Sequence, residues 1–148
     1  MRVLFGLLGL ALLVLGAGCG GGDDAPTVVL RPEGRPEVQI RVEVARTQPE
    51  HAEGLMFREH MDSDAGMLFV YEDESIRAFW MKNTLIPLDM IFISADHQVV
   101  GIVENAEPQT ETVRQVDRPA QFVLEVNGGF AAAQGIAEGT PVEIRNVD

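Results

Sequence analysis

Three charged or amide side chains interrupt the apolar segment "FWMKNTLIPLDMIFI", which spans residues 79–93. They are Lys82, Asn83 and Asp89. A buried carboxylate without a partner is costly or stays protonated. We therefore expect Asp89 to be hydrogen-bonded or paired, and we favour a pair with a cation, for which Lys82 and Arg58 are the two candidates. Lys82 is the only lysine in the chain, which suggests that a compact ammonium suits this position better than a planar guanidinium.

This expected pair has two interpretations, and the sequence leaves both open. In the first, a Lys82–Asp89 ion pair only holds a turn in place. In the second, the same residues border a pocket beside Trp80, the only tryptophan, because an apolar ring next to polar groups is typical of binding sites. A single tryptophan in a β-rich chain is also a candidate core residue. The predicted ligand-binding residues are Arg58, Trp80, Lys82, Asn83 and Asp89.

Four functions are compatible with these residues. The favoured one is a noncatalytic module that binds a small polar ligand, with a saccharide stacked on Trp80 as one candidate. A hydrolase-like enzyme would use Lys82 and Asp89 as base and acid. The sequence, however, contains no recognisable nucleophile–base pair, phosphate-binding loop or pair of catalytic carboxylates. We therefore assign no catalytic residue and no cofactor.

The third and fourth functions require neither a ligand stacked on Trp80 nor acid–base catalysis by Lys82 and Asp89. Thioethers suit Cu(I), and methionines recur in the apolar segments, although methionine is also an ordinary core residue. The methionines concerned are Met56, Met67, Met81 and Met90. No metal ligand is assigned on this basis. The fourth function is a structural partner of a complex in the cell envelope.

The elements that must position these residues are mostly short strands. "VQIRVEVA" from Val38 alternates apolar and polar residues, which indicates a half-exposed strand. Further strands are predicted at the ranges Gly66–Glu72 and Ile76–Asn83 and in the segments "LDMIFIS", "QVVGIVE", "QFVLEV" and "TPVEIR". "LDMIFIS" and "QVVGIVE" are expected to form a hairpin.

Two short helices complete the predicted domain. Thr47 and Glu50 have the spacing of a capping box, which predicts a helix of about three turns in "TQPEHAEGLMFRE". Asn127 is a candidate cap for a brief helix in "GGFAAAQG" that ends at Gly135. The polar segment "ENAEPQTETVRQVDRPA" is predicted to be a long loop. This pattern favours a mainly-β, single-domain β-sandwich or barrel-like (jelly-roll-like) fold with two short helices.

The N-terminus has the features of an export signal. Arg2 precedes the apolar run "VLFGLLGLALLVLGAG", and the only cysteine, Cys19, follows small residues as in a lipoprotein signal. We expect residues 1–18 to be the signal peptide, residues 19–37 a flexible tether, and residues 38–148 the β-sandwich domain. A lipidated Cys19 would anchor the protein to a membrane, and the expected location is the periplasmic face of the outer membrane.

The charge of the chain excludes one class of partner. Without Arg2, 10 basic side chains face 23 acidic ones. Such an acidic domain repels nucleic acid and anionic lipid. The expected partners are the membrane through the lipid anchor, a small polar ligand and an envelope protein.

Five segments together resemble a known family. They are "GLMFRE", "GMLFVYE", "FWMKNTLIPLDMIFI", "VLEVNGG" and "GIAEGTPVEI", in this order. The chain resembles domain-of-unknown-function family 192 from Val38 to Ile144. The departures from the family pattern, "ADH" at a turn and Thr140, leave the central segment intact. The resemblance implies a compact β-sandwich, often behind a signal peptide, and implies no settled activity.

Overall fold

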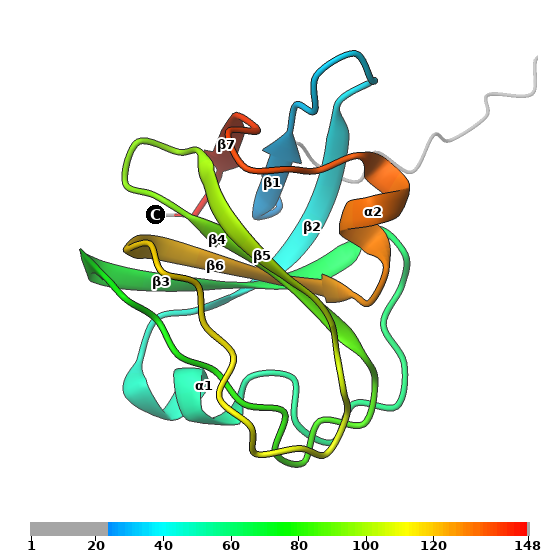
Figure 1. Ribbon diagram of the computed structural model, residues 1–148, viewed down its shortest axis with the longest axis vertical. Coiled ribbons are helices and arrows are strands. Elements are labelled where there is room, and N and C mark those ends of the chain that lie inside the picture. Colours follow the sequence, from blue (N-terminus) through cyan, green and yellow to red (C-terminus); the bar gives the residue numbers. More distant parts are fainter. Residues whose placement is uncertain (1–23, 148) are drawn as a thin grey trace, which may run out of the picture.

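A computed structural model describes residues 24–147, which form one curled seven-stranded sheet with two short helices (Figure 1). The strands are β1 (Thr27–Leu30), β2 (Val38–Ala45), β3 (Ala65–Ser75), β4 (Leu88–Ile93), β5 (Val99–Ala106), β6 (Ala120–Asn127) and β7 (Val142–Arg145). The helices are α1 (Gln48–Glu53) and α2 (Phe130–Gln134). The predicted mainly-β, barrel-like class with two short helices is confirmed.

The strand order across the sheet is β5-β4-β6-β3-β2-β1-β7. Only β2 and β3 are parallel, and the other neighbours are antiparallel. The two ends of the sheet approach each other, because Val99 N–H donates to the Thr140 carbonyl at 3.0 Å and Val142 N–H donates to the His97 carbonyl at 2.9 Å. The fold is therefore a half-barrel built from one sheet.

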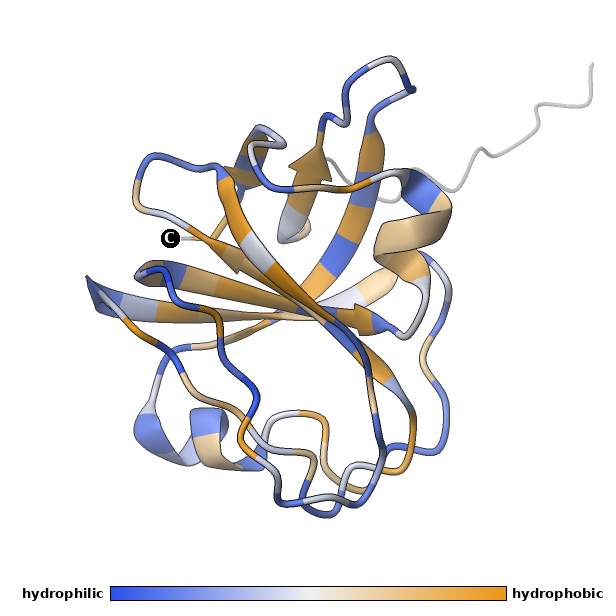
Figure 2. Cartoon of the chain, viewed as in Figure 1, coloured by the Kyte–Doolittle hydropathy of each residue, from blue (hydrophilic) through white to orange (hydrophobic). Residues whose placement is uncertain are grey.

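Two apolar clusters fill the domain. The first contains mainly valine, isoleucine and leucine from β1, β2, β4 and β6, together with α2. The second contains phenylalanine and methionine and lies under α1 and the neighbouring loops. β4 contributes to both clusters and is buried along its whole length. Figure 2 shows it as an almost continuous hydrophobic strand, whereas β2 alternates as the sequence predicts.

Three connections come together on one side of the sheet, in the lower part of Figure 1. They are residues 46–64, 76–87 and 107–119. Backbone hydrogen bonds join them, from Phe57 N–H to the Asn83 carbonyl at 2.8 Å and from Gln109 N–H to the Thr84 carbonyl at 3.0 Å. The predicted long loop is thus confirmed, and it braces the segment that contains Trp80.

The structure corrects three predicted elements. β3 continues through the expected "EDES" turn to Ser75, and the predicted strand Ile76–Asn83 does not form. That segment has a single isolated β-bridge, from Phe79 to Arg114, because the adjacent loop follows it only briefly. α1 has the predicted capping box but ends after six residues at Gly54, which adopts a positive φ of 49°.

The domain also begins earlier than expected. β1 lies within the segment predicted to be tether, and it pairs with both β2 and β7. Its residues Val28, Val29 and Leu30 are fully buried. The predicted signal peptide and Cys19 lie outside the described residues. Within residues 24–147, neither helix has the length and apolar character needed to cross a bilayer.

Candidate functional site

Asp89 is fully buried, but its partners are backbone amides rather than a cation. One carboxylate oxygen accepts hydrogen bonds from the N–H groups of Asn105 at 2.8 Å and Gly129 at 3.0 Å. The other oxygen accepts one from Ala131 N–H at 2.8 Å. Asp89 therefore satisfies the exposed amides at the start of α2 and one amide of β5. The predicted cation pairing of Asp89 is wrong.

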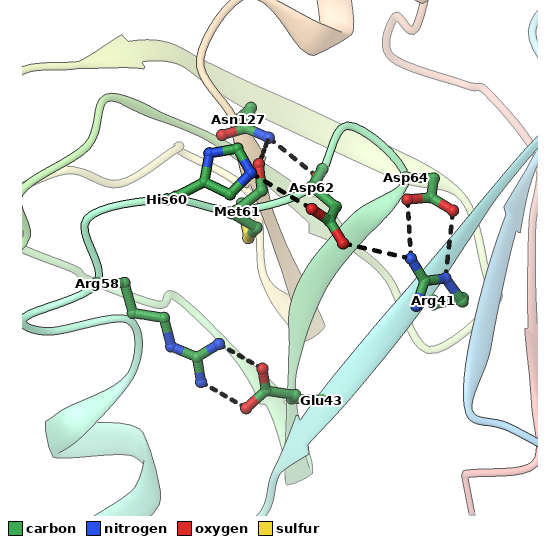
Figure 3. Close-up of polar contacts among 8 residues, drawn as sticks. All are labelled: Arg41, Glu43, Arg58, His60, Met61, Asp62, Asp64 and Asn127. Atoms are coloured by element: carbon green, nitrogen blue, oxygen red, sulfur yellow. Dashed lines mark hydrogen bonds and ion pairs between the residues drawn. The ribbon is translucent and has the colours of Figure 1, made fainter.

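This finding also corrects the predicted cap of α2. Its N-cap position is Gly129, which has no side chain to accept a hydrogen bond. Asn127, the predicted cap, instead donates to the carbonyl oxygens of Met61 and Asp62 (Figure 3). The predicted end of the helix at Gly135 is correct. The side chain of Asp89 on β4 thus caps the start of α2, which is the role predicted from the sequence for the side chain of Asn127.

The two cations expected at Asp89 bind other carboxylates. Arg58 makes two hydrogen bonds to Glu43 of β2, as Figure 3 shows, and these lower the pKa of that carboxyl. Lys82 lies 3.4 Å from Glu111. The structure therefore separates Asp89 from Arg58 and Lys82, and the five predicted site residues do not form one cluster.

Trp80 and Lys82 do remain together, at the entrance to a pocket. The Lys82 ammonium lies 5.1 Å from the centre of the Trp80 ring, and the Trp80 side chain is 47% exposed. Trp80 is therefore not a core residue. Asn83 stands beside this entrance, where its amide lies 3.8 Å from the Met56 sulfur.

We call this cavity the Glu125 pocket. It is lined by His51, Ala52, Glu53, Gly54, Leu55, Met56, Phe69, Phe79, Trp80, Lys82, Thr84 and Glu125. Its volume is about 30 Å³, which is room for roughly two water molecules. A separate, larger cavity of about 260 Å³ adjoins it and includes Arg58, Glu43 and Met67. The Glu125 pocket thus accepts an ion or one small polar group, not a sugar ring.

Glu125, on β6, was not predicted as a site residue, yet it is the most unusual group of the pocket. It is 4% exposed, and within residues 24–147 its carboxyl makes no hydrogen bond or ion pair. Burial alone raises its pKa from 4.5 to about 8. At neutral pH this carboxyl is therefore mostly protonated and faces a cavity without a protein partner.

His51 contributes a second acceptor to the pocket. Its Nε2 lies 3.0 Å from the Ala45 carbonyl, which can only accept, so Nε2 carries a proton and donates. In the neutral ring Nδ1 then keeps its lone pair. The ring packs on Tyr71 at 4.4 Å between centroids. The residues predicted from the sequence include Trp80 and Lys82 of this pocket, whereas the only sequence signal for Glu125 is its place as a single acidic residue within the apolar strand "QFVLEV".

Comparison with known proteins agrees with this fold. The family model of DUF192, described as "Uncharacterized ACR, COG1430", matches residues 28–144. A comparison with curated proteins found no match. A crystal structure of a protein of unknown function from Novosphingobium aromaticivorans is 42% identical, with a TM-score of 0.76, and the match covers 79% of this chain and 83% of that one.

A second solved structure is similar over more of its length. It comes from Sinorhizobium meliloti, is described as a "putative transcription regulator", and is 35% identical with a TM-score of 0.78. The match covers 84% of this chain and 98% of that one. The family match spans nearly all the described residues, from within β1 to within β7. The chain therefore belongs to the DUF192 family.

Proposed function

We propose that the protein is a noncatalytic binding module that holds one end of a small ligand in the Glu125 pocket. The observation that carries this proposal is the carboxyl of Glu125, which belongs to a 4% exposed residue, opens onto the cavity and has no hydrogen-bond partner among residues 24–147. A buried polar group without a partner is costly, and a ligand that donates a hydrogen bond or brings a positive charge would offset that cost. Trp80 offers an exposed apolar face at the entrance.

The pocket supports binding better than catalysis. The enzyme alternative used Lys82 and Asp89, but both oxygens of Asp89 accept hydrogen bonds from the backbone on the far side of β4 from the pocket. The only hydroxyl that lines the pocket belongs to Thr84, and it donates to the Lys82 carbonyl at 3.3 Å. No described nucleophile therefore lies beside a base in the pocket.

Nucleic acid is a poor candidate for the ligand. The similar protein from Sinorhizobium meliloti carries the description of a regulator, but the present chain has a formal net charge of −12. An acidic protein is repelled by the phosphate backbone. The size of the pocket also restricts a saccharide to stacking on Trp80 with a single hydroxyl inserted toward Glu125.

Ligand binding should change the fluorescence of Trp80, the only tryptophan in the chain. We expect at least one class in a panel of sugars, amines and metal ions to give a saturable change in emission. Glu125→Gln should weaken that binding about tenfold or more, because an amide cannot become a carboxylate when a donor or a cation binds. Glu104→Gln, at an exposed position of β5, is the matched control.

Two results would count against the binding module. One is a panel without any saturable response, and the other is a response that Glu125→Gln leaves unchanged. Recovery of one stoichiometric protein by crosslinking, together with a silent panel, would favour the alternative of an accessory partner in an envelope complex.

We further propose that the module is held at the cell envelope by a lipid on Cys19. Support comes from the sequence, where an apolar run and small residues precede this cysteine. β1 begins at Thr27, so a tether from Cys19 would be shorter than the predicted range of residues 19–37. The periplasmic face of the outer membrane is the proposed location.

Labelling cells with radioactive palmitate tests the anchor. The wild-type chain should become labelled and sediment with membranes, whereas Cys19→Ser should do neither. A wild-type chain that stays unlabelled, or a serine variant that labels equally well, would remove the anchor. Neither result would affect the binding experiment.

A further inference from the structure

The methionines of the domain gather on one side of the sheet. The first apolar cluster contains none. The second contains Met61, Met67, Met81 and Met90, and Met56 lines the Glu125 pocket. These are all the methionines of residues 24–147. The two clusters therefore differ in chemistry, because only the cluster on the side of the Glu125 pocket contains thioethers beside its aromatic and aliphatic side chains.

Sheet register places two of these methionines directly beside Glu125. Met67 of β3 and Met90 of β4 are its partners across the two neighbouring strands. Directly paired residues project from the same face with Cβ atoms about 5 Å apart. Met56 lines the Glu125 pocket from the loop after α1, whereas Met67 lines the adjoining cavity. Glu125 therefore has thioether-bearing neighbours both in the sheet and at the pocket wall.

The chemistry of this set selects a soft, singly charged metal ion. Thioethers are soft, neutral ligands that favour Cu(I), whereas Mg²⁺ and Ca²⁺ require several oxygen ligands. Within the described residues, no group of three or more histidine, cysteine, aspartate or glutamate side chains is arranged to hold a metal. An ion fits a cavity of about 30 Å³, whereas most organic ligands would fit only in part.

Charge complementarity favours the same ion. A monovalent cation beside the single carboxylate of Glu125 avoids an uncompensated buried charge. Lys82, which also lines the pocket, is itself offset by Glu111.

We propose that one Cu(I) ion binds where the Glu125 pocket adjoins the larger cavity, between the carboxylate of Glu125 and the thioethers of Met56 and Met67. This inference rests on the proposed binding function and names its ligand. His51 stands at the pocket wall with Nε2 held by a backbone carbonyl, which is the usual orientation of a histidine that binds metal through its other nitrogen. It is a candidate fourth ligand.

Competition with the chelator bicinchoninate tests the proposal under anaerobic conditions. The full chain should carry Cys19→Ser, because a free thiolate also binds Cu(I). We expect the chain to withdraw one equivalent of Cu(I) from the chelator, with a change in Trp80 emission that saturates at the same ratio. Zn²⁺ and Mg²⁺ should give no such change.

Variants of single residues then locate the ion. Met56→Leu, Met67→Leu and Glu125→Gln should each weaken Cu(I) binding about tenfold or more. Met61→Leu is the matched control, because Met61 belongs to the same apolar cluster but lines neither cavity. It should change the affinity less than about twofold, since a methionine-to-leucine exchange conserves volume. Thermal unfolding verifies that each variant is folded.

Failure to withdraw Cu(I) would overturn the proposal, as would equal weakening by Met61→Leu and Met67→Leu. If the chain does not bind Cu(I) but an organic ligand still changes Trp80 emission in a Glu125-dependent manner, the Cu(I) site is wrong and the proposed binding module is retained. If Cu(I) and the ligand panel both fail, both proposals fall.

Discussion

Replacing Asp89 with alanine should lower the free energy of unfolding by about 3–5 kcal/mol. The carboxylate is fully buried and accepts hydrogen bonds from three backbone N–H groups, those of Asn105, Gly129 and Ala131. Alanine would leave these donors without partners inside the protein. The loss should appear in urea unfolding as a lower midpoint with an unchanged slope.

Two control variants separate this account from an ion pair. Asp89→Asn keeps the shape but turns an NH₂ group toward an N–H donor, so most of the stability should still be lost. Lys82→Ala should change the stability by less than about 1 kcal/mol, because its ion pair with Glu111 is exposed. A loss from Lys82→Ala as large as that from Asp89→Ala would mean that the cation does support Asp89.

Replacing Glu125 with glutamine should stabilise the protein at pH 8 by an amount on the order of 4 kcal/mol. Burial raises the pKa of Glu125 from 4.5 to about 8, so the folded protein keeps this proton to a higher pH than the unfolded chain. The favourable contribution of the protonated Glu125 carboxyl to the free energy of unfolding is full below pH 4.5. It is lost as the pH rises to about 8. Glutamine cannot ionise and removes this dependence.

The measurement is urea unfolding of both proteins at several pH values between 4.5 and 8. The difference in unfolding free energy should be small at pH 4.5 and grow by about 1.4 kcal/mol per pH unit. The difference between the unfolding free energies of the two proteins cancels the contribution of groups that titrate equally in both. Glu104→Gln is the control, because it also removes one glutamate, but at an exposed position. A difference that stays constant across this range would show that the Glu125 carboxyl is not held protonated.

This expected gain bears on function as well as stability. An apolar side chain at position 125 would continue the surrounding cluster, which includes Met67, Met90 and Val123. The carboxyl instead weakens the fold over the pH range in which most proteins work. Groups that violate the rules of core packing tend to occur at functional sites. The stability cost of Glu125 therefore supports the pocket as the place where the protein binds its ligand.

Much of the local structure followed from the sequence, because it depends on neighbours along the chain. The alternation in "VQIRVEVA" sets which side chains of β2 are buried. The spacing of Thr47 and Glu50 sets the start of α1, and Gly135 sets the end of α2. The need of a buried Asp89 for partners was also predictable, since burial of a charge requires them.

Only the tertiary structure decided which groups meet that need. The amides that bind Asp89 lie far from it in the chain, and they reach it because β4 lies beside β5 and α2 follows its neighbour β6. Likewise, the period of two in "QFVLEV" separates Glu125 from Phe122 and Leu124, but it does not reveal that α1 and two loops cover that face. Periodicity reports the side of a strand on which a residue lies, and long-range packing decides what it meets there.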